Sequence, residues 1–251
     1  MLISEEIQKE YVELLLKDHK IHGKILDVGC GTGNALSFIR QEDIIVYNGI
    51  DLSKEMIQFA KNRFNSSNTN FCVGDFLKIK KKYILANYND YVICSGALHW
   101  FRPHEVDVMN MIYDTLKPKG KLLLSFAADF NMIQINNNIK RCIIKELCKK
   151  YNINIPSKKS FKSIRFNDQE IKNITKKFTL VSYEHIEKKI CFSSYEKFKS
   201  WNLASGLYFK QYIPIDIQEM FVDDYFHKLY KEYIIANYNQ RISLVLLSLE
   251  K

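Results

Sequence analysis

Glycines and acidic residues at fixed spacing mark the part of this chain best suited to binding a ligand. Residues 25–28 form an apolar run that contains Asp27, and a second apolar stretch ends at Asp51. Three glycines follow the first run: Gly29, Gly31 and Gly33. The run predicts a buried parallel strand, and the glycines allow a sharp turn that approaches a ligand before a helix begins near Asn34. Because the carboxylate of Asp51 can accept hydrogen bonds from both hydroxyls of a ribose, the sequence predicts a nucleoside site.

The spacing of the glycines indicates which nucleoside fits. A dinucleotide site needs G-x-G-x-x-G, but position 34 is Asn34. The acid Asp27, two residues before Gly29, would repel a pyrophosphate. The same carboxylate suits a ligand that carries a cationic amino group.

At these residues the chain resembles the class I S-adenosylmethionine (SAM)-dependent methyltransferases, and three further matches follow in the family's order. Ser53 is a predicted N-cap of a helix, and the resemblance implies that Leu52 and Met56 sandwich the adenine, although Met56 at helical spacing also fits a core position. Asp75 and the backbone of Phe76 fit the adenine edge, with an ordinary Gly-Asp turn as the alternative. The third match runs through a strand over 90–95, residues 98–100, and a Leu-x-Pro-x-Gly turn over 116–120 to a strand over 121–126.

The resemblance implies an α/β fold with a Rossmann-like seven-stranded sheet flanked by helices and helical cap insertions. Its seventh strand is expected antiparallel between the fifth and sixth. The implied cofactor-binding residues are Asp27, Gly29, Gly31, Gly33, Asp51, Leu52, Met56, Asp75, Phe76 and Ser95.

One domain over residues 1–251 is expected. Its core comprises about 24–128 with 178–191 and 241–250, and its cap elements comprise about 129–177 and 192–240. Apolar periodicity predicts helices over 4–16, 131–150 and 166–178, a polar loop over 156–162, strands over 180–191 and 242–249, and a helical excursion over 193–240. Asn167 or Asp168 is the expected cap of the third helix.

Composition limits the class of protein. The 251 residues are 47% hydrophobic, no run is long enough for a membrane helix, and the acidic amino terminus does not resemble a signal peptide. Six scattered cysteines without paired spacing predict reduced thiols, a cytoplasmic location and no metal. Only six of the 37 basic residues are Arg, so the net charge of +9 is read as solvated lysine rather than a nucleic-acid site. The same charge can attract an acidic substrate or an acyl carrier protein.

The methyl acceptor is assigned by a weaker likeness. Residues 98–100 and the excursion around Trp201 resemble the trans-aconitate, juvenile hormone acid and malonyl-acyl carrier protein carboxyl O-methyltransferases, the last of which acts in biotin synthesis. A carboxylate is ionised at neutral pH and needs no general base, so proximity in a dry pocket can carry the reaction. The predicted catalytic residues are His99, Trp100 and Trp201, against the alternative of ordinary packing.

Several residues have two possible roles in the sequence. Arg102, Lys210 and Arg241 can clamp a second carboxylate or be solvated charges, and Tyr11 can close over the cofactor or lie in the core. The expected partner is a small carboxylate or an acyl carrier protein, with no nucleic acid or membrane. Alternatives are a methyltransferase of a quinone ring carbon or a small amine, and a SAM-binding protein without turnover.

Overall fold

The computed structural model describes residues 3–79, 86–127, 134–154, 166–190, 192–204, 207–235 and 240–251. These residues form two compact units. The larger unit comprises Ile7–Ala128, Ile164–Ile186 and Ser243–Lys251, and the smaller comprises Met1–Glu6, Asp129–Ser163 and Glu187–Ile242. The segment predicted as a cap, 129–177, is therefore divided between the two units.

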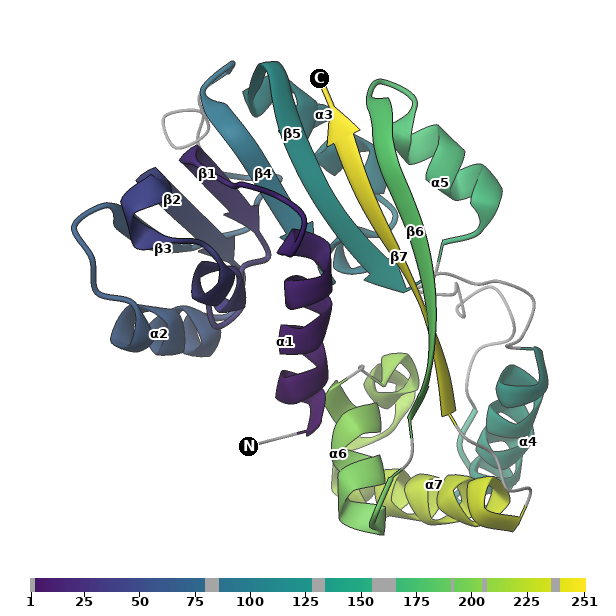
Figure 1. Ribbon diagram of the computed structural model, residues 1–251. Helices are drawn as coiled ribbons and strands as arrows, with labels where there is room; N and C mark the ends of the chain where they lie inside the picture. The colour runs from purple at the N-terminus through teal and green to yellow at the C-terminus, as the bar shows by residue number, and fades with distance from the viewer. Residues whose placement is uncertain are drawn as a thin grey trace. The chain divides into compact units, whose positions relative to one another are not determined.

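A seven-stranded sheet in the order β3-β2-β1-β4-β5-β7-β6 organises the fold (Figure 1). Its strands are β1 Gly23–Val28, β2 Ile44–Asp51, β3 Thr69–Val73, β4 Asn89–Ser95, β5 Leu116–Ala127, β6 Thr179–Ile190 and β7 Gln240–Glu250. Strands β1 to β5 pair in parallel, whereas β7 pairs antiparallel with β5 and lies between β5 and β6. The predicted fold class and the predicted place of the last strand are thus confirmed.

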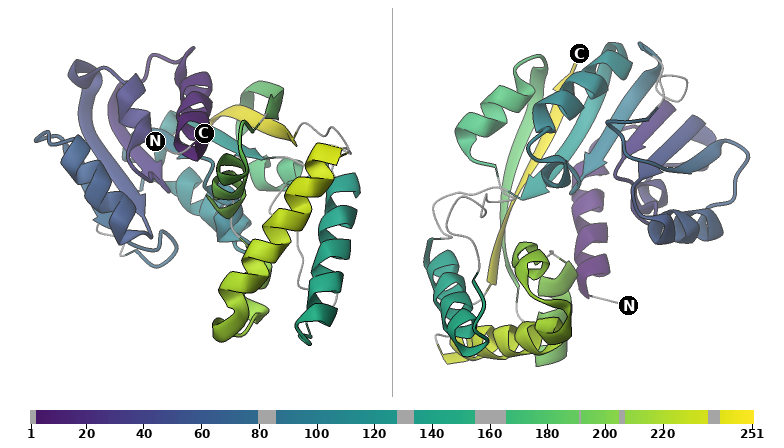
Figure 2. Two further views of the ribbon diagram at one scale, coloured as in Figure 1. Left: turned by 90° about the horizontal axis from the view of Figure 1, so that it is seen from below. Right: turned by 180° about the vertical axis from the view of Figure 1, so that it is seen from behind.

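Helices cover both faces of the sheet. Helices α1 (Ile3–Leu16) and α2 (Lys54–Arg63) contribute to one hydrophobic cluster with β1, β2 and β4, so they lie on the same face. Helices α3 (Glu105–Thr115) and α5 (Asp168–Thr175) contact each other, and the right-hand view of Figure 2, seen from behind, shows them on the near side of the sheet. The central strands β1 and β4 are buried on both sides, which explains why their sequences are continuous apolar runs instead of alternating ones.

The smaller unit contains the helix predicted over 131–150 and the helices predicted between the last two strands. They are α4 Gln134–Lys150, α6 Tyr195–Ala204 and α7 Ile215–Ile235, with a short 3₁₀-helix at Tyr208–Tyr212. Leu147, Phe198 and Phe226 lie in their shared aromatic core. Lys150 and Tyr151 both bind the carboxylate of Asp224, which ties the end of α4 to α7. The predicted loop over 156–162 lies outside the described residues.

Of two local predictions, the structure supports the first with a turn-like bulge and contradicts the second. The Leu-x-Pro-x-Gly segment is assigned to β5, yet Asn89 pairs with Leu116 and Tyr91 with Lys121, so the intervening residues bulge out of the ladder. Lys119 has a φ of 64° within this bulge, which is a turn-like conformation. The predicted helix after the glycine turn is only a short 3₁₀-helix, Asn34–Phe38.

Among the described residues, no helix combines the length and apolarity needed to cross a bilayer.

Candidate functional site

The predicted site residues gather where the parallel strands end. Because β1, β2, β3 and β4 all run in the same direction, their carboxyl ends lie along one edge of the sheet. The strand order reverses between β1 and β4, and open α/β sheets bind ligands outside such a reversal. The predicted cofactor-binding residues, with His99 and Trp100, belong to the larger unit. Trp201 lies in α6 of the smaller unit, and its role stays a prediction.

Backbone hydrogen bonds hold the glycine turn onto the end of β2. The N–H groups of Gly29 and Cys30 donate to the carbonyl of Ile50 at 2.8 and 3.1 Å. Gly29 has a φ of 71°, and a Cβ at this position would lie 2.3 Å from the Cβ of Ala97. A glycine is therefore required both by the backbone conformation and by the close approach of the loop after β4.

The Asp51 carboxylate is positioned by two backbone donors. Its Oδ2 accepts from the N–H of Gly31 at 2.9 Å, and its Oδ1 accepts from the N–H of Ser53 at 2.9 Å. Each carboxylate oxygen has a second lone pair, so both can still accept a hydroxyl. This geometry fits the predicted contact with both hydroxyls of a ribose.

Leu52 and Met56 present apolar surface beside Asp51. Their exposed fractions are 73% and 43%, whereas the core positions of α2 are Ile57 and Ala60. Met56 is held in the first turn of α2, where its N–H donates to the Ser53 side chain at 3.2 Å, which confirms the predicted cap. The alternative core position of Met56 is thus not observed, and the exposed pair suits a flat base.

Asp75 and Phe76 occupy the turn after β3. Asp75 accepts from the N–H of Leu77 at 3.0 Å and forms an ion pair with Lys78 at 3.1 Å, so the turn reading has direct support. Phe76 is 2% exposed and contacts Phe101 edge to face at 6.4 Å. An adenine contact by Asp75 stays a prediction.

Ser95 ends β4 in a hydrogen-bonded pair that sequence reasoning missed. The hydroxyls of Ser95 and Ser125 lie 2.9 Å apart, and Ser125 also accepts from the N–H of Gly96 at 3.2 Å. A serine in the otherwise apolar run of β5 was the available signal, because a buried hydroxyl needs a partner.

A second partnership links Asp27 to Tyr47 of β2. The Tyr47 hydroxyl donates to Asp27 Oδ2 at 2.5 Å, and the two residues are 0% and 3% exposed, respectively. Burial raises the pKa of Asp27 to about 7, against the opposing effect of the Tyr47 hydrogen bond, and the Asp51 charge raises it further. Sequence reasoning missed Tyr47 as well, although a hydroxyl within the apolar β2 required a partner.

His99 and Trp100 lie in a short 3₁₀-helix, Leu98–Phe101, directly after β4. Their rings are 4.8 Å apart, and Trp100 is 59% exposed. Burial lowers the pKa of His99 to about 4, with a further contribution from the charge of Arg102, so the imidazole is neutral at pH 7. Within the described part of the chain, the buried Nδ1 of His99 has no hydrogen-bond partner.

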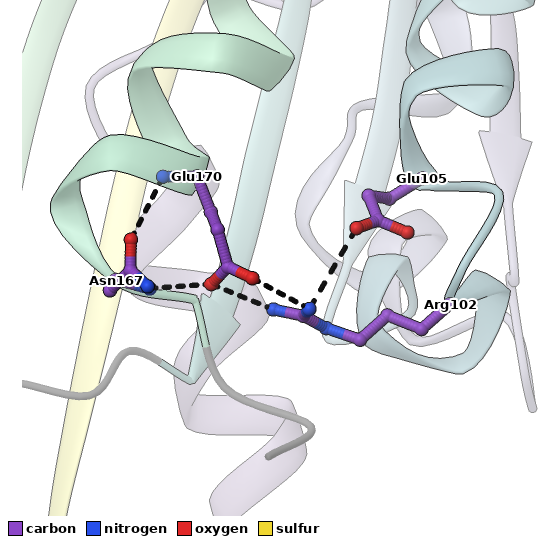
Figure 3. Close-up of polar contacts among 4 residues, drawn as sticks. All are labelled: Arg102, Glu105, Asn167 and Glu170. Carbon is purple, nitrogen blue, oxygen red and sulfur yellow. Dashed lines mark hydrogen bonds and ion pairs between the residues drawn. The ribbon is translucent and has the colours of Figure 1, made fainter. Parts of the chain in front are cut away.

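Arg102 follows this segment and binds protein carboxylates (Figure 3). Its Nη1 and Nη2 lie 2.8 and 3.0 Å from the two oxygens of Glu170, and Nη1 lies 3.7 Å from Glu105. The guanidinium also stacks on the Phe166 ring at 4.3 Å. Glu170 in turn completes a capping box with Asn167, which confirms the predicted cap of α5. These contacts argue against the alternative in which Arg102 clamps a substrate carboxylate.

Comparison with known proteins agrees with this geometry. Residues 25–120 match the sequence profile of the methyltransferase domain family. A candidate methyltransferase from Bacillus halodurans has a similar crystal structure, with a TM-score of 0.62 at 14% identity, covering 96% of this chain and 99% of that one. The chain has the class I methyltransferase fold. The predicted cofactor, SAM, agrees with the family match.

Two curated relatives are O-methyltransferases by name. Malonyl-[acyl-carrier protein] O-methyltransferase of Acetivibrio thermocellus is 32% identical over 127 residues, which cover 49% of this chain and 42% of that enzyme. The chain thus spans less than half the length of this relative. Juvenile hormone acid O-methyltransferase of Bombyx mori is 24% identical over 235 residues, covering 88% of this chain and 82% of that enzyme.

Proposed function

We propose that this methyltransferase fold transfers the methyl group of SAM to a carboxylate. The main support for SAM binding is the arrangement of residues around Asp51. A carboxylate fixed by the N–H groups of Gly31 and Ser53 stands next to the exposed Leu52 and Met56. A nucleoside site requires hydrogen-bond acceptors for the ribose and an apolar surface for the base, and both are present here.

Asp27 and the glycine turn suit the other end of the cofactor. The amino acid portion of SAM carries an ammonium group, and a buried carboxylate attracts a cation strongly because little water screens it. The turn after β1 lets the backbone approach a ligand closely beside Asp27, which supports this assignment. The residues present therefore fit the group.

A carboxylate acceptor suits the residues after β4. In the reaction, an acceptor oxygen forms a bond to the methyl carbon, the carbon–sulfur bond breaks, and its electron pair stays on the sulfur, which leaves S-adenosylhomocysteine. No proton has to be removed from the acceptor. The neutral His99 can donate a hydrogen bond to the second acceptor oxygen, and the exposed Trp100 can form an apolar wall. The names of the two O-methyltransferase relatives, one for malonyl-acyl carrier protein and one for juvenile hormone acid, support the same class.

Cofactor binding is tested with Asp51→Ala in isothermal titration calorimetry with S-adenosylhomocysteine. We expect an affinity loss of at least about 100-fold, since the variant removes the acceptor of both ribose hydroxyls at about 1.5–3 kcal/mol for each charge-assisted bond. Asp43→Ala is the matched control, because Asp43 lies just before the opposite end of the same strand. An unchanged affinity of the Asp51 variant would refute the assignment of the pocket.

The acceptor is tested by transfer from methyl-labelled SAM to trans-aconitate, fatty acids, malonyl-acyl carrier protein, quinone precursors and glycine. A labelled product that base hydrolyses is an ester and supports the proposal. A base-stable product indicates a carbon or nitrogen acceptor. Tight cofactor binding without transfer to any of these compounds indicates a binding protein without turnover.

A further inference from the structure

Tyr47 and Asp27 form a buried hydrogen bond at the edge of the sheet where the predicted cofactor-binding residues lie. Both residues lie within the sheet, with Tyr47 in β2 and Asp27 in the neighbouring β1, and their oxygens are 2.5 Å apart. The register places Asp27 opposite Gly49, two residues beyond Tyr47, so the tyrosine side chain lies on the same face and extends toward the carboxyl end. A Cβ at Gly49 would lie 2.7 Å from the Phe71 ring and 2.9 Å from the sulfur of Cys30, so the packing beside the pair leaves no room for a side chain there.

The direction of this hydrogen bond is determined by the two acidities. Burial and the neighbouring Asp27 charge hold the pKa of Tyr47 well above its usual value, so the hydroxyl keeps its proton. Tyr47 is therefore the donor and Asp27 the acceptor. A donor of this kind stabilises the ionised form of a carboxyl group. The bond uses one carboxylate oxygen, and a carboxylate has two.

The other groups near Asp27 oppose its ionisation or are neutral. Asp51, at the end of β2, adds a negative charge that raises the pKa of Asp27. The thiols of Cys30, in the glycine turn, and Cys94, in β4, are neutral because burial raises their pKa above the usual value. Among the groups that act on Asp27, Tyr47 is thus the one that favours the anion.

We propose that Tyr47 is a positioning residue for the cofactor, which holds Asp27 ionised and oriented so that its carboxylate binds the ammonium group of the SAM amino acid portion. This inference rests on the proposed function. It assigns to Tyr47 an effect on ligands that carry the amino group, and no effect on ligands that lack it. It also makes the affinity for such ligands dependent on pH near neutrality, because an un-ionised Asp27 does not attract a cation.

The experiment compares S-adenosylhomocysteine with 5′-methylthioadenosine, which keeps the nucleoside and the thioether but lacks the amino acid portion. Affinities of the wild-type chain are measured by calorimetry from pH 5.5 to 8.5. We expect S-adenosylhomocysteine to bind more weakly as pH falls, with a midpoint near 7, and 5′-methylthioadenosine to bind equally at every pH. A flat profile for S-adenosylhomocysteine would overturn the inference without any variant.

Tyr47→Phe then isolates the hydroxyl. The ring contact with Phe71, at 5.8 Å between centroids, does not depend on the hydroxyl, so phenylalanine preserves the packing. Loss of a hydrogen bond that stabilises a carboxylate raises the pKa of that carboxyl group by about one unit or more. We expect the midpoint to move up by about one unit, with about 5-fold weaker S-adenosylhomocysteine binding at pH 7 and unchanged 5′-methylthioadenosine binding.

The outcomes separate the two proposals. If both ligands weaken equally in Tyr47→Phe, the residue acts through the shape of the pocket and the inference is wrong. The same conclusion follows if the midpoint does not move. If the wild-type chain binds neither ligand, the proposed function itself fails and the inference fails with it. Binding of both ligands by the wild type, with an unchanged midpoint in the variant, overturns the inference alone.

Discussion

Replacing Arg102 with alanine removes the cation at the centre of a small buried network. The Arg102 side chain is 13% exposed, and its carboxylate partners Glu105 and Glu170 are 14% and 36% exposed. The change leaves both carboxylates without this cation and removes the stacking of the guanidinium on Phe166. The segment that carries His99 then loses this ion pair to Glu170 near the start of α5.

The expected cost follows from burial. Breaking a buried pair by removing one partner costs about 3–5 kcal/mol, whereas an exposed pair contributes about 0–1 kcal/mol. Solvent screens part of the Glu170 contact, but Glu105 is left enclosed. We therefore expect Arg102→Ala to lower the free energy of unfolding by about 3 kcal/mol.

Urea denaturation followed by circular dichroism measures this loss. Arg40→Ala is the matched control, because Arg40 also lies 2.8 Å from a carboxylate, that of Asp43, but its side chain is 72% exposed. The control should lose less than about 1 kcal/mol. Adding Glu105→Gln to Arg102→Ala should restore part of the stability, since it removes one of the uncompensated charges. Equal losses in Arg102→Ala and Arg40→Ala would refute the reasoning from burial.

Three further predictions concern the same unit. Asn167→Ala removes the capping box of α5 and should cost about 1 kcal/mol in denaturant unfolding, whereas Asn167→Ser should stay within a few tenths of wild type. His99 is neutral when folded and binds a proton when unfolded between its usual pKa of 6.5 and its folded pKa of about 4, so it costs stability as pH falls through that range. Between pH 7 and pH 4, the free energy of unfolding of His99→Gln should therefore fall by about 3 kcal/mol less than that of the wild type. An equal dependence of the unfolding free energy on pH in the two proteins would contradict this. Gly29 and Gly31 both have a positive φ, but a Cβ at Gly29 would also clash with Ala97, whereas a Cβ at Gly31 meets no atom within 4 Å. Thermal unfolding should therefore show Gly29→Ala less stable than Gly31→Ala by at least about 2 kcal/mol.

The sequence by itself determined the order of the strands and the edge of the sheet where the predicted site residues gather. Apolar runs such as 25–28 are long enough to identify buried strands, and the glycines after Val28 mark a turn that few other residues allow. The caps at Ser53 and Asn167 were equally readable, because a cap acts on backbone groups two or three residues away. Local chemistry of this kind does not depend on the rest of the fold.

The tertiary structure alone decided which polar side chains meet. Tyr47 is 20 residues from Asp27, and Glu170 is 68 residues from Arg102. Periodicity places a side chain on a face of its strand or helix, but the partner depends on the register of neighbouring strands and on how helices pack across them. The acidity of Asp27 and His99 likewise follows from burial, which is a property of the assembled fold. The chemistry of this edge thus starts with residue types written in the sequence and is tuned by contacts that exist only after folding.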